Sequence, residues 1–308
     1  MNQAEAVIAL EILNVGFGQS IIAYPVGEKA PLLVIDGGDD RPEIYSRSTH
    51  ATPLQERLRR LGAQSIDLMI ATHPHRDHIG GLAQVAEAFP VGRLATFFDL
   101  PPAPIPAGEG NMHAAIRLYG EMLAALRRQR TEILLPLGGG DLHCGGIKIK
   151  VYPPNAALLE QARSRLFASA QSPEPEKLDR LSAMLNGVCM NLRLDLNGVG
   201  VFLPADTPLS QWEEVSGAEL AAQIMTAPHH GDADCLSPAL LKKIGADCAV
   251  ISADTAGTYG LPNPKAAAML AEGGVGRVLF TAGGPDAESA GGVRFEIAPG
   301  GEFSWEYL

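Results

Sequence analysis

A short histidine-rich segment constrains the fold of this chain more than any other feature. Residues 72–81 (THPHRDHIGG) follow an apolar run at residues 66–71, which is typical of a buried strand. Residues 82–89 come next and have the apolar spacing and the residue types of a helix. The segment is therefore predicted to form a strand-to-helix turn, where side chains can converge on a cleft instead of packing into the core.

Four side chains of this turn form a candidate metal site. His73 and His75 are two residues apart, so both imidazoles can face the same side of an extended turn, and Asp77 and His78 follow where the chain turns. A single histidine is usually a surface or core residue, but three histidines and an aspartate within six residues are hard to reach by chance in a chain with 8 histidines. Imidazole nitrogen and carboxylate oxygen are ligands that suit Zn, Fe or Mn.

The composition is that of a globular protein with a marked negative charge. The 308 residues could form one large domain or two small ones, and 46% hydrophobic against 19% charged residues excludes a disordered chain. A net charge of −11 repels nucleic acid unless a basic patch or a bound metal offsets it. No apolar run is long enough to cross a membrane, and residues 1–6 do not resemble a secretion signal. The 4 cysteines have no paired spacing, so we expect reduced thiols and a cytoplasmic location.

The first third of the chain is predicted to be rich in strands. Strands at residues 7–15 and 21–24 flank a loop that contains Gly16 and Gly18. This loop is either a hairpin turn or a place where backbone amides approach a phosphate. A third buried run ends in Asp36, which is either a turn former or a carboxylate that orients metal ligands.

The middle of the chain is less regular. Residues 52–61 predict an amphipathic helix, and a longer helix is expected over residues 112–130. The longer helix ends in a basic cluster, which is either a solvated helix end or a patch for an anionic substrate. Residues 172–177 are polar and Pro-rich, and predict a loop or a mobile lid. We expect a single domain over the whole chain, with an insertion of loops and helix at about residues 100–187.

The last third supplies the other candidate ligands. A hairpin is predicted over residues 189–203, around the Asn197–Gly198 turn signal. Asp206 follows this hairpin and can reach a metal from the side opposite the histidine turn. A short apolar strand then leads to His229 and His230. Each of these residues is a weak signal alone, but together with the histidine turn they form a consistent set, because one turn cannot enclose two metals.

The order of these motifs resembles the metallo-β-lactamase superfamily: Asp-Gly-Gly, then His-X-His-X-Asp-His-X-Gly-Gly, then a strand-end Asp, then His-His-Gly. Within it, residues 14–20, 72–81 and 227–231 resemble the soluble hydrolase domain of ComEC-like DNA-uptake proteins. The match is spread from about residue 8 to about residue 285. The resemblance implies a four-layer αββα sandwich, with two mixed sheets face to face, helices outside, and a metal site on loops at one edge.

The resemblance also implies roles for individual residues. His73 and His75 would bind the first of two divalent metal ions, and Asp77 and His78 the second. Asp206 would bridge the two ions. The set is completed by one of His229 and His230 at the second ion, with Asp36 as a supporting acid.

Two departures from the family pattern affect this set. Many members carry a further histidine before the bridging aspartate, whereas this chain has Asn186 and Cys189 there. The first site then keeps two imidazoles and the bridge, or recruits Cys189 as a thiolate; we expect an inert, buried thiol. The ComEC-like group often has His-Pro after Tyr-Gly, and this chain lacks that histidine. Lys265 nearby is either an anion contact or an ordinary surface lysine.

These features predict a metal-dependent hydrolase. Two cations about 3.5–4 Å apart lower the pKa of a shared water, so that hydroxide exists at neutral pH, and Asp77 or Asp206 could take the remaining proton. A small nucleotide-type phosphodiester is the favoured substrate, because the net charge disfavours nucleic acid. The alternatives are a hydrolase of a lactone, lactam or thioester, and a non-catalytic metal- or partner-binding member of the fold. Zn or Mn is expected, with Fe as a further option; the oligomeric state is not predicted.

Overall fold

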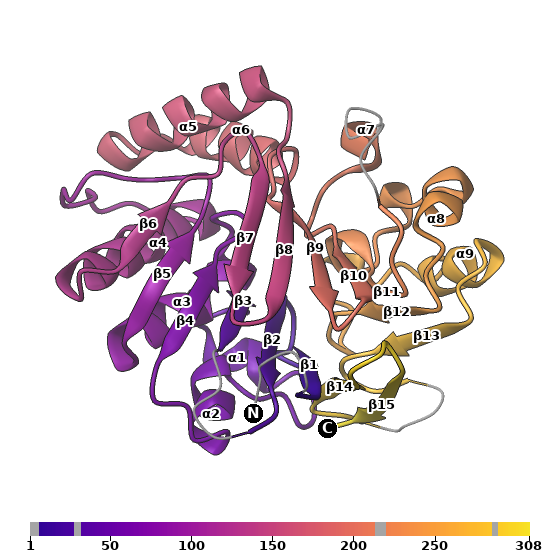
Figure 1. Ribbon diagram of the computed structural model, residues 1–308. Helices are drawn as coiled ribbons and strands as arrows, with labels where there is room; N and C mark the ends of the chain where they lie inside the picture. Colours follow the sequence, from indigo (N-terminus) through magenta and orange to yellow (C-terminus); the bar gives the residue numbers. More distant parts are fainter. Residues whose placement is uncertain (1–5, 28–31, 213–219, 285–288) are drawn as a thin grey trace.

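The protein is an α/β sandwich of two β-sheets that lie between two groups of helices, as the computed structural model shows (Figure 1). It describes residues 6–27, 32–212, 220–284 and 289–308. The sequence predicted no secretion signal at residues 1–6, and residues 1–5 lie outside the described residues. The two mixed sheets with helices outside confirm the predicted fold class.

The first sheet is built from the N-terminal strands and closed by the C-terminal hairpin. Its strands are β1 (Ile8–Leu13), β2 (Ser20–Pro25), β3 (Leu33–Gly37), β4 (Ile66–Ile70), β5 (Val91–Ala95), β6 (Glu132–Leu134), β14 (Gly292–Ile297) and β15 (Phe303–Tyr307). Their order in the sheet is β15-β14-β1-β2-β3-β4-β5-β6. The pairs from β3 to β6 are parallel and the others are antiparallel. The carboxyl ends of β3 and β4 therefore lie side by side, which brings Asp36 next to the histidine turn.

The second sheet has the same mixed character. Its strands are β7 (Gly140–Cys144), β8 (Ile147–Tyr152), β9 (Asn191–Leu196), β10 (Val199–Leu203), β11 (Ile224–Thr226), β12 (Cys248–Ile251) and β13 (Arg277–Phe280). They are ordered β13-β12-β11-β10-β9-β8-β7, with parallel pairs from β10 to β13. The Asn197–Gly198 turn joins β9 to β10 in the predicted hairpin. Both turn residues have positive φ, as a two-residue hairpin of this kind requires.

The helices cover the outer faces of the sheets. They are α1 (Pro42–Tyr45), α2 (Leu54–Arg60), α3 (Arg76–Ala88), α4 (Asn111–Arg128), α5 (Ala156–Gln171), α6 (Pro175–Asn186), α7 (Leu209–Trp212), α8 (Pro238–Ile244) and α9 (Ala266–Glu272). In Figure 1, α2 to α4 lie on the left, α8 and α9 on the right, and α5 and α6 across the top. Helices α5 and α6 were not predicted individually from the sequence. Residues 172–177 were expected to form a loop or a mobile lid, but only residues 172–174 lie between the two helices, since α6 begins at Pro175.

The expected insertion at residues 100–187 contributes to both sheets as well as to the helical layer. It contains α4, α5 and α6, but also β6 of the first sheet and β7 and β8 of the second. That the whole chain forms a single domain stays a prediction.

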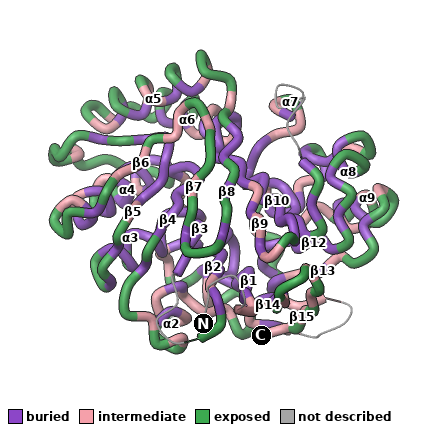
Figure 2. The backbone as a smooth tube through the Cα atoms, viewed as in Figure 1, coloured by how far each residue is buried: buried purple, intermediate pink, exposed green. Residues whose placement is uncertain are grey.

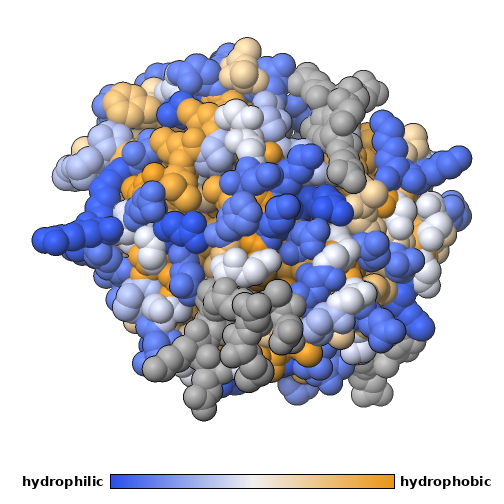
Figure 3. All heavy atoms as spheres, in the orientation of Figure 1, coloured by the Kyte–Doolittle hydropathy of each residue, from blue (hydrophilic) through white to orange (hydrophobic). Residues whose placement is uncertain are grey.

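The core fills the space between the sheets and beneath the helices. Every residue of β1, β3 and β10 is buried, so these strands are mostly apolar runs that do not alternate with exposed residues (Figure 2). On the face shown in Figure 3, side chains are mostly hydrophilic, with an apolar area towards the upper left, near α5 and β6 in Figure 1.

One acidic side chain lies within this core. Glu11 of β1 is fully buried, and its carboxylate accepts two hydrogen bonds of 2.7 Å from Arg57 of α2 and one of 2.9 Å from the Tyr24 hydroxyl. Burial and then the charge of Glu11 raise the pKa of Tyr24 to about 12, which keeps its hydroxyl a donor. The ion pair fastens α2 to the first sheet.

Candidate metal centre

The candidate ligands converge from the carboxyl ends of strands in both sheets. His73 and His75 lie on the turn between β4 and α3, and Asp77 and His78 lie in the first turn of α3. Asp206 follows β10 of the other sheet. The short 3-10 helix η2 (Pro228–His230) follows β11, the parallel neighbour of β10. Within each sheet, loops at the carboxyl ends of adjacent parallel strands lie at one edge. The candidate ligand atoms from the two sheets lie close together there, so both sheets contribute to one centre.

The first group of possible ligands is His73, His75 and Asp206. One nitrogen of each histidine and one oxygen of the aspartate all lie within 4.8 Å of one another. The Nε2 atom of His73 is 2.9 Å from Nδ1 of His75 and 3.7 Å from Oδ2 of Asp206. Burial lowers the pKa of both imidazoles, and that of His73 lies well below its usual value. Both rings are therefore neutral at pH 7, which is the form that binds a metal.

The second group is Asp77, His78, Asp206 and His230. Nε2 of His78 is 3.2 Å from Oδ2 of Asp206, and Nε2 of His230 is 3.2 Å from Oδ2 of Asp77 and 3.5 Å from Oδ1 of Asp206. Asp206 therefore belongs to both groups.

Each histidine of the two groups turns one ring nitrogen to the protein and the other to the centre. Nδ1 of His78 is 2.8 Å from Asp36, and Nδ1 of His230 is 2.9 Å from the Ser252 carbonyl oxygen. The opposite nitrogens of these two rings, together with Oδ1 of Asp206, are buried and have no hydrogen-bond partner among the described residues. Buried polar atoms rarely stay unpaired, so this set of inward-facing nitrogens and oxygens fits a metal centre.

Electrostatics at the second group also fit a cation. Burial lowers the pKa of a histidine, but here the charges of Asp206 and Asp36 outweigh it and hold the pKa of His78 well above its usual value. In the same way Asp206 and Asp77 raise the pKa of His230 to about 9. Burial raises the pKa of Asp206, yet the charges of His78 and His230 bring it well below its usual value. The carboxylates thus attract positive charge strongly, and a divalent cation would displace the imidazole protons.

The structure separates the two adjacent histidines of η2, which the sequence could not do. His230 is buried and faces the second group, whereas His229 is half-exposed, with Nδ1 3.2 Å from Asp232 and Nε2 3.9 Å from Asp206. Both histidines have positive φ, so the backbone turn sends their side chains in different directions. His229, Asp232 and Cys235 form a third, separate cluster of possible ligands.

Several orienting side chains support the two groups. Asp36 accepts hydrogen bonds from the Thr72 amide at 2.9 Å and the Thr72 hydroxyl at 2.7 Å, in addition to its contact with His78. The Thr72 oxygen is in turn 3.1 Å from Nδ1 of His73, so one carboxylate aligns two imidazoles. Asp36 was identified from the sequence as a candidate for this role, but Thr72 was not, although its place between the strand and the first histidine is a usable signal.

Two further orienting groups could not be found from the sequence. The Ser182 hydroxyl of α6 is 3.1 Å from Nε2 of His75, and the backbone carbonyl of Ser252, just after β12, meets His230. Ser182 is 107 residues from its partner, and a backbone carbonyl carries no residue-type signal.

The remaining predicted residues lie around the centre. Nδ2 of Asn186 is 3.4 Å from Nε2 of His229, and Oδ1 of Asn186 is buried without a hydrogen-bond partner among the described residues. Cys189 is fully buried, with Sγ 3.6 Å from the Leu185 carbonyl oxygen, and burial raises the pKa of its thiol well above the usual value. Lys265 is exposed, and its backbone amide donates to Asn263. A role for these side chains in binding metal or substrate stays a prediction.

The loop with the two glycines packs tightly against the histidine turn. A Cβ atom on Gly18 would lie 2.3 Å from the Asp77 carbonyl oxygen, and one on Gly16 would lie 2.6 Å from that of Ile44. The next amide in the loop, that of Gln19, donates to the Asp77 carbonyl oxygen at 3.1 Å. Gly18 therefore permits close backbone contact with the ligand-bearing helix α3, and Gly16 permits the same with α1; the proposed approach to a phosphate stays a prediction.

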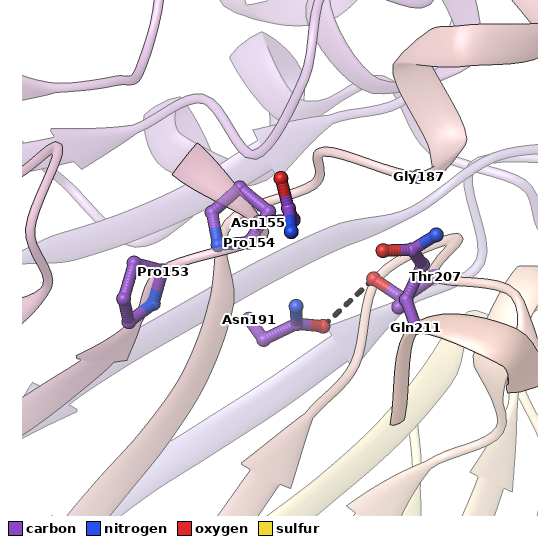
Figure 4. A pocket seen from close by; sticks show the side chains of 7 residues that line it. All are labelled: Pro153, Pro154, Asn155, Gly187, Asn191, Thr207 and Gln211. Atoms are coloured by element: carbon purple, nitrogen blue, oxygen red, sulfur yellow. Dashed lines mark hydrogen bonds between the residues drawn. The ribbon is translucent and has the colours of Figure 1, made fainter. Parts of the chain in front are cut away.

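A polar pocket of about 440 Å³ lies beside Asp206, between the ends of α5, α6 and β10 (Figure 4). Its lining includes the side chains of Asn155, Asn191, Thr207 and Gln211, and contains no charged group. The Thr207 hydroxyl donates to Oδ1 of Asn191 at 2.8 Å. This hydrogen bond fixes the backbone directly after Asp206.

Comparison with known proteins supports the fold. Residues 18–95, which include Asp36 and the whole histidine turn, match the metallo-beta-lactamase superfamily. The two mixed sheets with helices outside are consistent with the metallo-β-lactamase sandwich fold. No curated protein matches the sequence.

Two solved structures are similar to this chain along its length. One is Igni18, described as a novel metallo hydrolase from the hyperthermophilic archaeon Ignicoccus hospitalis, with 14% identity, a TM-score of 0.48, and coverage of 98% of this chain and 99% of that chain. The other is the metallo-beta-lactamase fold protein YhfI from Bacillus subtilis, with 12% identity, a TM-score of 0.47, and coverage of 98% and 100%. Within the part of this chain that the structure describes, no helix is both long and apolar enough to cross a membrane.

Proposed function

We propose that this protein is a dinuclear metal-dependent hydrolase that acts on small nucleotide-type phosphodiesters. The observation that carries the proposal is the arrangement of two buried ligand groups around one carboxylate, Asp206. His73 and His75 would hold one cation with Asp206, and Asp77, His78 and His230 the other. Zn or Mn is the expected ion, with Fe as a further option, since the donors are imidazole nitrogen and carboxylate oxygen.

Two bound cations would supply Lewis acidity and lower the pKa of a bound water. The chain's own contribution is to hold the ligands in place and to accept the proton. Asp77 is better placed for proton transfer than Asp206, because its side chain is 18% exposed whereas that of Asp206 is 3% exposed. Both oxygens of Asp206 face imidazoles, which leaves Asp206 the bridging role.

A phosphodiester is favoured over a carbonyl substrate by the residues at the first group. Carbonyl-cleaving relatives generally add another imidazole, and Asn186 and Cys189 stand at that part of this chain. A small anionic substrate also suits a chain of net charge −11 better than a long nucleic acid does.

The test combines metal content with turnover of bis-p-nitrophenyl phosphate in the presence of Zn²⁺ or Mn²⁺. Elemental analysis should find about two metal ions per chain, as in other two-metal sites. Asp206→Asn should lose metal and turnover together, because both groups depend on this carboxylate. His143→Ala removes an exposed histidine on β7, and this control should leave both measurements unchanged.

Other outcomes would refute the proposal in distinct ways. Two bound metals with turnover of a lactone or thioester, but not of the phosphodiester, would assign the centre to carbonyl hydrolysis. A protein that binds no metal and turns over none of these substrates would be a binding protein on a hydrolase fold.

A further inference from the structure

One aromatic side chain close to the candidate metal centre, that of Tyr259, is exposed to solvent. Tyr259 is 70% exposed, the largest exposure of any large hydrophobic side chain in the described part of the chain. It lies in the 3-10 helix η4 (Thr258–Gly260), in the loop that follows β12. Large aromatic side chains are normally at least half-buried, so such exposure calls for an explanation.

The backbone holds Tyr259 in an unfavourable conformation. Its φ and ψ are 57° and 19°, in the left-handed region, where a bulky side chain is a genuine outlier. The loop around it is tied down by Asp254, which accepts hydrogen bonds from the amide of Thr258 at 3.1 Å and from its hydroxyl. Strain of this kind persists where the surroundings fix it, and it clusters at ligand-binding sites.

Ring contacts connect Tyr259 to the second ligand group through Phe17. Its ring packs edge-on against Phe17 with centroids 5.2 Å apart, and Phe17 packs against the His230 ring at 4.6 Å. Phe17 is 3% exposed, so it supports Tyr259 from below. Ser252, at the start of the same loop, accepts the hydrogen bond from Nδ1 of His230. A single side chain, that of Phe17, therefore separates the exposed ring from the candidate ligand His230.

Positive charge borders this ring. The Arg41 guanidinium pairs with Asp39 at 2.6 Å and also interacts with the Tyr259 hydroxyl. Arg47 is exposed and donates a hydrogen bond of 3.3 Å to the Thr258 hydroxyl. Among the described residues, Arg47 has no carboxylate partner, so its charge is open to an anion.

We propose that Tyr259 is a stacking platform for a nucleobase, which places the attached phosphate between Arg47 and the metal centre. Bases stack on exposed aromatic rings regardless of sequence, because every base has a flat π-face. The inference rests on the proposed function for the nature of the reaction, but its base-binding step can be measured without turnover.

The test is calorimetric titration of the protein, as purified and with added Zn²⁺, with AMP and with ribose 5-phosphate. These probes carry the same phosphate and differ by the base, and AMP is a monoester of the kind that phosphodiester cleavage releases. The wild-type protein should bind AMP more tightly. Tyr259→Ala should weaken AMP binding about tenfold, from the usual strength of base–aromatic stacking, and ribose 5-phosphate binding by less than about twofold.

Two variants separate stacking from general damage. Tyr259→Phe keeps the ring and should keep AMP affinity within about twofold. Phe167→Ala removes another exposed aromatic side chain, on α5, and should leave both affinities unchanged.

Equal losses for both probes in Tyr259→Ala, or equal wild-type affinities, would overturn the platform. If bis-p-nitrophenyl phosphate is not hydrolysed while base-dependent binding still requires Tyr259, the proposed function fails and the platform stands.

Discussion

Asp36 offers a sharp test of the reasoning about the centre, because one side chain aligns two histidines. Oδ1 of Asp36 accepts from the Thr72 amide, and Oδ2 accepts from the Thr72 hydroxyl and faces Nδ1 of His78. In Asp36→Asn the shape is kept, but an NH₂ group replaces one oxygen. If the NH₂ group replaces Oδ1, it faces the Thr72 amide, which is also a donor; if it replaces Oδ2, it faces the Thr72 hydroxyl and Nδ1 of His78.

The expected magnitudes follow from that geometry. An unpaired buried donor costs about 1–3 kcal/mol of the free energy of unfolding. Loss of a partner that orients a metal ligand costs about 10–100-fold in metal affinity, which is about 1.4–2.8 kcal/mol. Metal affinity would be measured by competition with a chromophoric chelator, and stability by urea denaturation of the chelator-treated protein. Asp141→Asn, at an exposed carboxylate on β7, is the control for loss of charge.

The result that refutes this reasoning is a variant that loses stability but binds metal as tightly as the wild type. Asp36 would then be a structural side chain, and the alignment of His78 would depend on other contacts.

Three further predictions concern other parts of the structure. His230→Ala should lose about one metal ion per chain by elemental analysis, whereas His229→Ala should keep both, since only His230 faces the second group; equal losses would contradict this assignment. Glu11→Ala leaves Arg57 without its buried acid, and should cost about 3–5 kcal/mol of unfolding free energy in urea; a change below about 1 kcal/mol would be inconsistent with a buried ion pair. Burial raises the pKa of Asp40, but its hydrogen bond and charge interaction with Arg76 outweigh this and leave the pKa lowered. The folded pKa is thus below the unfolded one, so this pair stabilises the protein above about pH 4, and the contribution is lost as the pH falls through the folded pKa. Acid titration of unfolding should therefore be flatter in Asp40→Asn, and an unchanged titration would show that the pair contributes nothing.

The sequence predicts the parts of this fold that depend on local patterns. The strands β1, β4 and β10 are mostly apolar runs, and the Asn197–Gly198 turn has a short-range signal, so their positions follow from neighbouring residues. The candidate ligands lie together in two groups because they follow strand ends, and strand ends meet at one edge of a sheet.

The start of α3 shows where local patterns fail. Gly80 and Gly81 suggested that the helix begins after them, yet it begins at Arg76 and includes both. A Cβ on Gly81 would lie 2.0 Å from the Gly37 carbonyl oxygen, and one on Gly80 would lie 2.4 Å from the Asp40 amide nitrogen. The glycines allow the helix to pack against the end of β3, and this tertiary requirement overrides their low helix propensity.

Other features depend on contacts that no local pattern encodes. Asn155 caps α5 and accepts hydrogen bonds from the amides of Ala157 and Leu158. The helix lacks a clear apolar stripe, so the sequence did not predict a helix there. The contact between Ser182 and His75 joins α6 to the histidine turn across the fold. Sequence periodicity carries no information on such pairs.

Because Asp206 belongs to both ligand groups, two ions bound as proposed would be thermodynamically dependent on each other. An ion bound at one group would partly neutralise the negative charge of the Asp206 carboxylate, and an ion at the other group would then be attracted less strongly. Filling one position therefore changes the affinity of the other by a fixed factor, and linkage requires the same factor in the reverse direction. A titration with metal should follow a coupled two-site isotherm, and two different ions added in either order should reach the same final distribution.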